Sequence, residues 1–392
     1  MKLKLISLLL LLAMLCSAMV ACVPSGDSSG TDSSNPPATD GGEEQKPEFA
    51  SGTGTAEDPF VISEPYQWQN MSNHLSSHFV LGADLTMAAI EDLAPIGTAS
   101  KPFAGTLDGA GHTLKNMIVG AKENAGVFGV ISGATIKNLN VSDSVIEFRY
   151  KKQDRLYYGG LVAQAKNASK IENCHITSTD VKYASSWGDL IYVGGLVGNL
   201  ESFSELTYCS IDMAFVVDSQ EGNIHLGGIV GAAENAKITG CAATGTVVVR
   251  KPSHYLNNKT RQVAGLVFKM SNSSLTNSYA ALDFADNTAA AYTAALVYTL
   301  DSETEVYYNA SFCDFSIEPD ATKFDGRYNS CSILRGSSAD ENLYFRASDG
   351  LSLEGMNNKM VGEAFGGAFT EGTSHPVLLD YEAFLLALAA QQ

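Results

Sequence analysis

The sequence predicts an all-β solenoid in which short coils stack along one axis. Three observations support this prediction. A glycine-rich phrase recurs along the body of the chain, an alternating apolar and polar phrase follows each copy, and no helical period appears within this region. A single coil cannot bury its own apolar residues, but neighbours stacked about 4.8 Å apart pair its backbone and bury its side chains.

The first phrase has the form Gly-Gly-Leu-Val. Successive copies lie 34, 35, 33, 37 and 30 residues apart, counted from Gly126 to Ala295. The doublet changes to Ala-Gly and then to Ala-Ala while Leu-Val is retained, and the phosphate-binding pattern Gly-x-x-x-x-Gly-Lys is missing from the sequence. We therefore interpret the phrase as a corner that requires a small side chain, and not as a ligand loop. The copies are AGVF at 125–128, GGLV at 159–162, GGLV at 194–197, GGIV at 227–230, AGLV at 264–267 and AALV at 294–297.

The second phrase, such as IENCHI from Ile171, alternates apolar and polar residues and predicts a strand with one buried face. One position in it should form a column through successive coils. We expect the cysteines of this column to be buried free thiols. A disulfide between adjacent coils is possible on distance, although parallel side-chain directions disfavour it. The members of the predicted column are Leu139, Cys174, Cys209, Cys241, Ser278 and Asn309.

The N-terminal residues indicate secretion. Residues 1–21 place Lys2 and Lys4 before an apolar run and small residues, as in a cleaved signal peptide. Met-Val-Ala before Cys22 resembles the lipobox of bacterial lipoproteins, which implies a lipid on Cys22; ordinary cleavage near Ala21 is the alternative. Residues 22–50 are rich in Ser, Gly, Pro and acids, so we expect a disordered linker. The expected location is extracytoplasmic, exposed at the surface and lipid-anchored to the bacterial cell membrane or outer membrane.

Charge and cysteine spacing restrict the partners. Loss of Lys2 and Lys4 with the leader moves the formal net charge from −18 to −20, which argues against nucleic acid and anionic lipid headgroups as partners. The sequence contains no Cys-x-x-Cys pair, so a zinc site is not expected. We predict neither a metal nor a cofactor.

The Gly-Gly-Leu-Val-Gly phrases, together with the Ile-x-Asn-Cys-x-Ile type of phrase behind them, resemble the GLUG repeat of secreted bacterial surface proteins. These include adhesins and the non-catalytic regions of certain immunoglobulin A peptidases. The resemblance covers roughly residues 120–315 and implies a right-handed parallel β-helix. We expect a capping helix over residues 64–75 within the first coils, because an open first coil would otherwise pair with other strand edges. The predicted divisions are 51–120 for the first coils and N-terminal cap, 121–335 for the repeats and 336–392 for a C-terminal coil and cap.

No catalytic constellation is evident in the sequence. Asp108 and His112 share a glycine-rich stretch, which we interpret as a tight turn in which Asp108 bonds the backbone. Acids in successive repeats fall at different distances past the column position, so they share no register. The motif His-Glu-x-x-His is also missing, and no Gly-x-Ser-x-Gly elbow occurs after the predicted linker. The acids compared are Asp143, Asp180, Asp212 and Asp283.

Loops inserted between coils usually emerge on one side of a solenoid and are natural contact surfaces. Here they carry Tyr150, Tyr157, Trp187 and Tyr255, which are candidate groups for stacking on sugars or anchoring a protein. The equal alternative is that these rings fold back over the coils. We expect a non-enzymatic, adhesin-like surface protein that binds host or envelope glycans or proteins. The alternatives are a polysaccharide lyase or glycoside hydrolase on the same fold, and an envelope scaffold without a discrete ligand.

Overall fold

The structure is a computed structural model of the chain. Residues 47–392 form one compact unit. The described residues are 46–88, 93–121, 124–149, 155–185, 190–219, 224–249, 261–285, 291–294, 296–301, 303–307, 309–312, 314–315, 343–344, 353–361 and 367–391.

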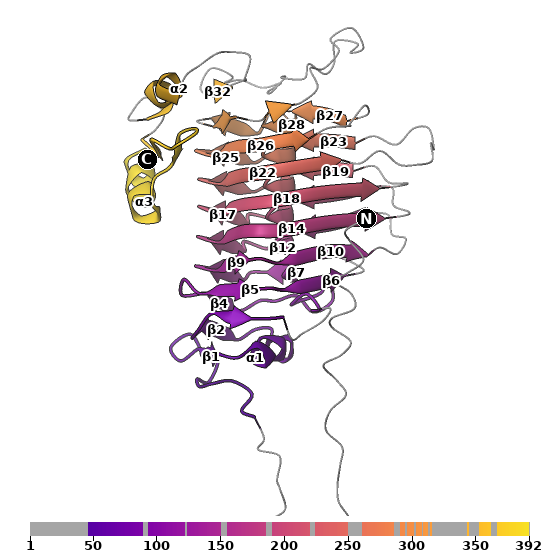
Figure 1. Cartoon of the computed structure of the whole chain (residues 1–392). Coiled ribbons are helices and arrows are strands. Elements are labelled where there is room, and N and C mark those ends of the chain that lie inside the picture. Colours follow the sequence, from indigo (N-terminus) through magenta and orange to yellow (C-terminus); the bar gives the residue numbers. More distant parts are fainter. Residues whose placement is uncertain are drawn as a thin grey trace, which may run out of the picture. The chain divides into compact units, whose positions relative to one another are not determined.

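The predicted parallel β-solenoid is confirmed: strands of successive coils stack into long parallel sheets (Figure 1). We name four of these sheets A to D. A full coil follows the order D, C, A and B, with the glycine-rich phrase at the corner between D and C. Equivalent residues pair directly, as Ile136, Ile171 and Leu206 do in sheet A.

Sheets A and B contain the second phrase of each repeat. In sheet B, the later strands continue without interruption into the β-branched segment that follows that phrase. Sheet A comprises β1 (Phe60–Ile62), β2 (His78–Leu81), β4 (Thr106–Asp108), β8 (Thr135–Lys137), β13 (Lys170–Glu172), β17 (Glu205–Thr207), β21 (Lys237–Thr239), β25 (Ser274–Thr276) and β29 (Glu305–Tyr307). Sheet B comprises β3 (Leu85–Thr86), β5 (Thr113–Lys115), β6 (Ile118–Ala121), β9 (Asn140–Ser142), β10 (Val145–Arg149), β14 (His175–Ser185), β18 (Ser210–Ser219), β22 (Ala242–Val249), β26 (Tyr279–Ala285), β30 (Ala310–Ser311), β31 (Asp314–Phe315) and β32 (Leu343–Tyr344).

Sheets C and D meet at the corner formed by the glycine-rich phrase. A Cβ atom at Gly159 would overlap the carbonyl oxygen of Val162, and one at Gly194 would overlap that of Val197. This close approach of backbone explains why the position accepts only small residues. Sheet C comprises β7 (Phe128–Ser132), β12 (Val162–Lys166), β16 (Val197–Glu201), β20 (Val230–Glu234), β24 (Val267–Ser271) and β28 (Val297–Leu300). Sheet D comprises β11 (Arg155–Gly159), β15 (Leu190–Gly194), β19 (Ile224–Gly227), β23 (Arg261–Ala264) and β27 (Ala291–Ala294).

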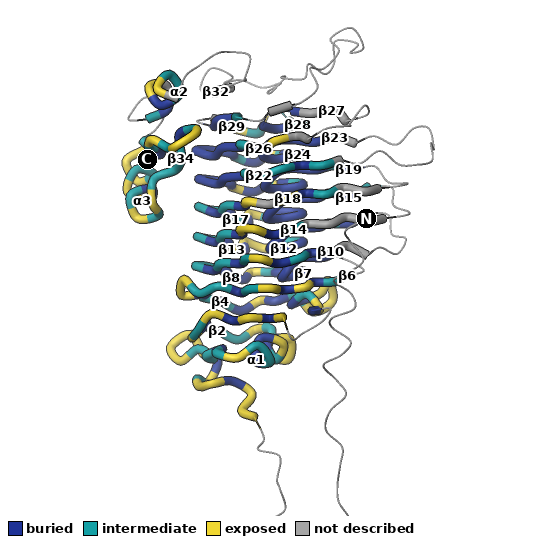
Figure 2. The backbone as a smooth tube through the Cα atoms, in the orientation of Figure 1, coloured by how far each residue is buried: buried dark blue, intermediate teal, exposed yellow. Residues whose placement is uncertain are grey.

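Buried apolar side chains run through successive coils and form one core (Figure 2). The predicted column is part of it. Cys174, Cys209 and Cys241 are free, buried thiols, and the backbone N–H of Cys174 lies 3.4 Å from the sulfur of Cys209. Burial raises the pKa of the Cys241 thiol to about 12, so this thiol stays protonated and behaves as a small apolar group.

A short helix lies at the N-terminal end of the stack, as predicted. It consists of α1 (Pro65–Asn70) and a 3₁₀ turn, η1 (Met71–Asn73), so helical structure ends two residues before the predicted bound. The Gln67 side chain accepts hydrogen bonds from the backbone N–H groups of Ser63 and Glu64, which begins the helix. Trp68 is buried and its ring packs edge-on against Phe128, so the helix covers the core of the first coils.

The C-terminal residues pack on the side of the stack. Helix α2 (Leu353–Met360) precedes a hairpin of β33 (Phe369–Thr370) and β34 (Val377–Leu378), and α3 (Tyr381–Ala390) follows (Figure 1). The ring of Phe384 in α3 lies over Gly240, and Tyr208 donates a hydrogen bond of 2.7 Å to the carbonyl of Leu379. Among the described strands, β34 pairs only with β33 in this hairpin, and α3 covers the turns between sheets A and B.

Candidate functional site

Of the four aromatic residues predicted in loops, the structure describes Tyr157. It lies on strand β11 rather than in a loop, which corrects the sequence prediction, and its half-buried ring stacks on Tyr192 with centroids 5.8 Å apart. Tyr150, Trp187 and Tyr255 lie outside the described residues.

Tyr157 begins an aromatic stripe that crosses successive coils on sheets D and C. The stripe continues from Tyr192 to His225 at 5.2 Å, from His225 to Phe268 at 4.3 Å, and from Phe268 to Tyr298 at 5.1 Å. Tyr192 and Phe268 are only 8% and 4% exposed. The stripe is therefore mainly a packing feature.

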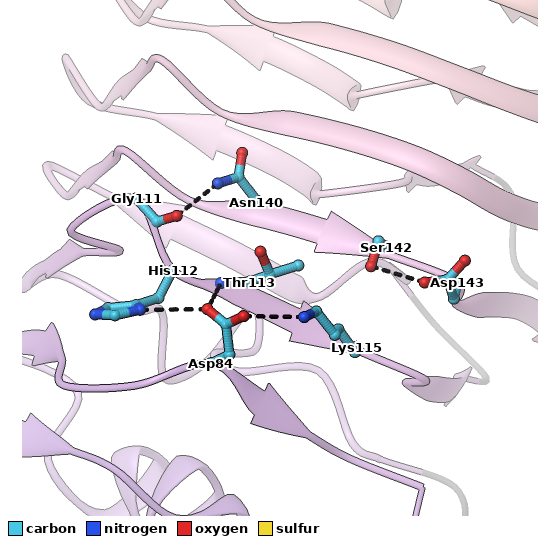
Figure 3. Close-up of polar contacts among 8 residues, drawn as sticks. All are labelled: Asp84, Gly111, His112, Thr113, Lys115, Asn140, Ser142 and Asp143. Carbon is cyan, nitrogen blue, oxygen red and sulfur yellow. Dashed lines mark hydrogen bonds and ion pairs between the residues drawn. The ribbon is translucent and has the colours of Figure 1, made fainter.

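The polar cluster around Asp84 connects the first coils (Figure 3). One oxygen of Asp84 accepts hydrogen bonds from His112 Nδ1 at 3.2 Å and from the backbone of Thr113 at 3.1 Å, while the other pairs with Lys115 Nζ at 2.9 Å. The hydrogen bond from Lys115, followed by those from Thr113 and His112, lowers the pKa of Asp84 to about 2. This exposed cluster fastens the segment before β3 to strand β5.

Asp108 and His112 do not act together, because His112 bonds Asp84 instead. Asp108 accepts hydrogen bonds from the backbone of Ala110 at 2.9 Å and from Asn138 at 3.0 Å. Burial opposes ionisation of Asp108, but these bonds and Lys137 together lower its pKa. The turn predicted at this position is confirmed.

The prediction that the acids of successive repeats share no register is wrong for two of them. Asp180 and Asp283 lie in one column of sheet B, which runs through Ala214 and Thr246, whereas Asp212 lies outside this column. Among the described residues, no group of three or more His, Cys, Asp or Glu side chains could hold a metal ion.

An open cavity of about 400 Å³ lies where sheet C turns into sheet A, and we call it the Phe203 cavity. Phe203 is 76% exposed at its edge. Ser202 and Phe203 both have positive φ angles, 57° and 65°, which is unusual for a bulky residue and holds the ring outward. The cavity is lined by Phe203, Glu205, Asn235, Ala236, Lys237, Asn272, Ser273, Ser274, Glu303 and Glu305.

The floor of the Phe203 cavity is a ladder of outward-facing residues on four neighbouring strands of sheet A. Glu205 pairs with Lys237, Lys237 pairs with Ser274, and Ser274 pairs with Glu305. Within the described part of the chain, Glu205, Lys237 and Glu305 form no side-chain hydrogen bond or ion pair, so these groups are available to a ligand. Three strand spacings separate Glu205 from Glu305, about 14 Å.

Sequence reasoning missed Phe203, although a signal was present. The distance from the glycine-rich phrase to the second phrase is 12 residues in this coil and in the preceding one, 194 to 206 and 159 to 171, against 11 in the next coil, 227 to 238. The additional residue widens the turn, and Phe203 occupies the widened part where the preceding coil has Ala168. An aromatic residue in such a one-residue insertion is a candidate contact group.

The stacked parallel sheets define the class of the protein, a parallel β-solenoid. The GLUG motif matches residues 222–248, and the described part of this range, 224–248, lies in one coil of the stack. The same phrases recur in the neighbouring coils. The chain thus carries the GLUG motif, as predicted from its repeated phrases.

Two curated relatives share a part of this sequence. A protein of Evansella cellulosilytica, provisionally named a Gly-rich membrane protein, is 30% identical over 108 residues, 25% of this chain and 12% of the relative. Halomucin of Haloquadratum walsbyi is 30% identical over 110 residues, 24% of this chain and 1% of the relative. The chain thus matches only a small part of either relative's length.

Two solved structures have a similar architecture. A crystal structure from Bacteroides ovatus, provisionally named an immunoglobulin A1 protease, aligns with a TM-score of 0.56 and 22% identity over 84% of this chain and 95% of that chain. At this identity, the likeness shows the fold alone. A structure named IgA1 Protease aligns with a TM-score of 0.47 and 17% identity over 72% of this chain and 21% of that chain.

Proposed function

We propose that this chain is a lipid-anchored, non-enzymatic surface protein that binds carbohydrate through the Phe203 cavity. The observation that carries the proposal is the exposed ring of Phe203 beside free polar side chains. A sugar ring has apolar C–H faces and polar edges, so it pairs well with one aromatic platform and several hydrogen-bonding groups. Asn235 and Lys237 supply donors, and Glu205 and Glu305 supply acceptors.

The charges of the cavity favour one class of sugar. Glu205, Glu303 and Glu305 face a single cation, Lys237, so the site carries an excess of negative charge. Uronic and sialic acids would be repelled by this excess. The ligands that fit are neutral sugars and sugars with a free amine.

The carboxylate spacing supports binding over hydrolysis. Glycosidases hold their two carboxylates about 5 to 10 Å apart, whereas Glu205 and Glu305 stand about 14 Å apart on the ladder. Glu303, two residues before Glu305, is the acid to test for the enzyme alternative. The proposal of a purely binding protein would be contradicted if the wild-type protein cleaved a polysaccharide and Glu303→Gln or Glu305→Gln did not. The protein would then be a hydrolase.

A screen of the purified protein on glycan and matrix-protein arrays tests the proposed binding. We expect saturable binding of neutral or amino sugars that Phe203→Ala weakens and Leu386→Ala preserves. Leu386 is a matched control because it is 74% exposed but lies on α3, away from the cavity. Binding to matrix proteins alone would contradict a carbohydrate ligand, and absence of all binding would favour a scaffold.

The surface location rests on two supports. The relatives are a provisionally named Gly-rich membrane protein and a halomucin, and Cys22 follows a signal-like leader. None of the described helices is both long and apolar enough to cross a membrane.

Cys22→Ser is the direct test of the anchor. We expect the variant to lose the mass of the lipid and to leave the detergent phase. The diacylglyceryl group proposed on Cys22 carries two acyl chains, which are enough to hold a protein on a membrane. Cys16→Ser, inside the leader, should behave as the wild type. Unchanged partitioning of the Cys22 variant would show that lipidation at this residue does not hold the protein.

A further inference from the structure

A second, smaller cavity lies between the coils and the C-terminal hairpin, at the other end of the short sheet A strands from the Phe203 cavity. Its volume is about 150 Å³. The C-terminal strand β34 forms one wall through Val377 and Leu378, and Tyr279 and Ala242 of sheet B form another. Much of this lining is apolar. The polar groups that reach the cavity belong to His175, Ser210, Tyr208 and Tyr279.

His175 and Ser210 occupy the same position in adjacent coils of sheet B and bond each other. His175 Nδ1 lies 2.8 Å from Ser210 Oγ, and His175 Nε2 lies 3.0 Å from Asn173 Oδ1. The chain of bonds continues across two further coils. Asn173 donates to Asn138 at 2.9 Å, and Asn138 donates to Asp108 at 3.0 Å.

The direction of this chain follows from its last member. The Asp108 carboxylate only accepts hydrogen bonds, so the amide nitrogen of Asn138 faces it and the Asn138 oxygen faces Asn173. The Asn173 oxygen is then left for His175 Nε2, which must carry the proton. His175 Nδ1 therefore presents a lone pair to the hydroxyl of Ser210.

The surroundings keep His175 in this neutral form. Burial lowers its pKa, and the ring of Tyr208 packs edge-on against it at 5.7 Å. A neutral imidazole with a fixed tautomer, an orienting amide on one nitrogen and a serine hydroxyl on the other is the arrangement of a nucleophile, a base and an orienting group.

We propose that Ser210 is a nucleophile that accepts small, uncharged acyl or phosphonyl groups in the cavity beneath the hairpin, with His175 as its base and Asn173 as a positioning residue. With an ester, Ser210 Oγ attacks the carbonyl carbon while its proton moves to His175 Nδ1. A bond from carbon to Ser210 forms, the bond to the alkoxide breaks, and the alkoxide leaves with the proton from His175. The apolar lining and the small volume select short, uncharged esters.

In the described part of the chain, the backbone near Ser210 provides no free N–H group to stabilise an oxyanion. We therefore expect the acyl or phosphonyl group to be transferred to Ser210 slowly and to stay there. The N–H of Ser210 bonds the carbonyl of Cys174, and that of Ala242 bonds the carbonyl of Cys209, so neither is available as an oxyanion donor. Burial raises the pKa of Tyr279 to about 12, so its hydroxyl stays protonated and is the donor that this cavity retains. We expect slow, stoichiometric labelling and little turnover.

A fluorophosphonate probe on the full-length protein tests the proposal. Attack by Ser210 forms a P–O bond and releases fluoride, which adds one probe mass that peptide mapping should place on Ser210. We expect Ser210→Ala to remove the label and His175→Gln to slow labelling about a hundredfold. Ser76→Ala, at an exposed serine that lines neither cavity, is the matched control and should label at the wild-type rate.

Two substitutions at Asn173 separate positioning from structure. Asn173 has a φ angle of 50°, which glycine adopts easily, so Asn173→Gly removes the acceptor without straining the turn. It should slow labelling about tenfold, whereas Asn173→Asp retains an acceptor and should restore the rate. No label on the wild-type protein, a label on another residue, or an unchanged rate in His175→Gln would overturn the proposal. These outcomes leave glycan binding at the Phe203 cavity unaffected.

Discussion

Residues with positive φ angles line the turn between sheets A and B in successive coils. Asn138, Asn173, Tyr208, Gly240 and Asn277 share φ angles of 50° to 63°. Asparagine tolerates this conformation, and its amide also bonds the next coil, as Asn173 does with Asn138. The ladder of asparagines changes to Tyr208 and Gly240 where the C-terminal residues pack. A single column thus supplies turns, hydrogen bonds and a docking surface.

The corner glycines should be sensitive to the addition of one methyl group. Gly194→Ala places Cβ against the carbonyl of Val197, and we expect a loss of about 2 to 4 kcal/mol in the free energy of unfolding. Gly111→Ala is the control, because Gly111 has a φ angle of 81° but open space around its Cβ position. It should cost about 1 kcal/mol from backbone strain alone. Equal losses in urea unfolding would contradict the close approach at the corner.

His225 should make the fold sensitive to mild acid. Burial, and then the charge of Lys269, lowers its pKa from 6.5 to about 4. Below pH 6.5 the unfolded chain binds a proton that the folded protein refuses, so stability falls as the pH drops toward 4, by about 2 to 3 kcal/mol. The pKa of Asp84 is lowered from 3.8 to about 2, so its contribution to stability is lost only as the pH falls below about 4.

Urea unfolding of the wild type and His225→Gln at pH 8 and pH 5 measures this effect. Loss of the stacked ring lowers the stability of the variant at both values, so the informative quantity is the change between them. We expect a smaller change in the variant than in the wild type. The same change in both proteins would show that His225 is protonated normally in the fold.

At the scale of elements, α3 is held by complementary features of distant segments. Asp380 accepts a hydrogen bond from the backbone of Ala383 at 3.1 Å and begins the helix. Phe384 is fully buried where Gly240 has no side chain. At the far end of the helix, Asn277 donates to Gln391 at 3.1 Å. The Tyr208 ring also packs on Phe384, so turn residues of three coils contact this one helix.

A double-mutant cycle tests this docking. Gly240→Ala would push Cβ into the ring of Phe384, so it should release α3 and expose residues 381–390 to amide hydrogen exchange. In a Phe384→Ala background the same change should cost only the backbone strain of a positive φ angle, about 1 kcal/mol. If the double variant lost as much free energy of unfolding as the two single variants together, direct packing between these residues would be contradicted.

At the scale of the whole molecule, repetition determined what could be predicted. The stacked fold, the corner at Gly194 and the column of Cys174 and Cys209 recur in successive coils, so one interpretation applied to all of them. Contacts that occur once have no such support. Nothing near Gly240 in the sequence indicates that Phe384 packs on it. The sequence prediction that Tyr157 lies in a loop is wrong because most of its strand, β11, precedes the repeated phrases.

The same reasoning explains the candidate sites. The Phe203 cavity arises where an aromatic residue occupies a turn that is one residue longer than the same turn in the next coil. The preceding coil has the same longer turn but carries Ala168 at this position, so the repeat length alone does not reveal the site. The pairing of His175 with Ser210 depends on the spacing of two coils, and its chemical direction depends on Asp108 two further coils away. The regular coils thus form the stacked sheets, and side chains that differ from coil to coil form the candidate sites.

The central claim is that the solenoid presents Phe203 as a platform for carbohydrate. Calorimetric titration of the full-length protein, Phe203→Ala and Leu386→Ala with the tightest array ligand tests it most directly. We expect Phe203→Ala to bind at least about tenfold more weakly, a loss of about 1.4 kcal/mol, while Leu386→Ala retains the wild-type Kd. Equal affinity of Phe203→Ala and the wild type would contradict the account.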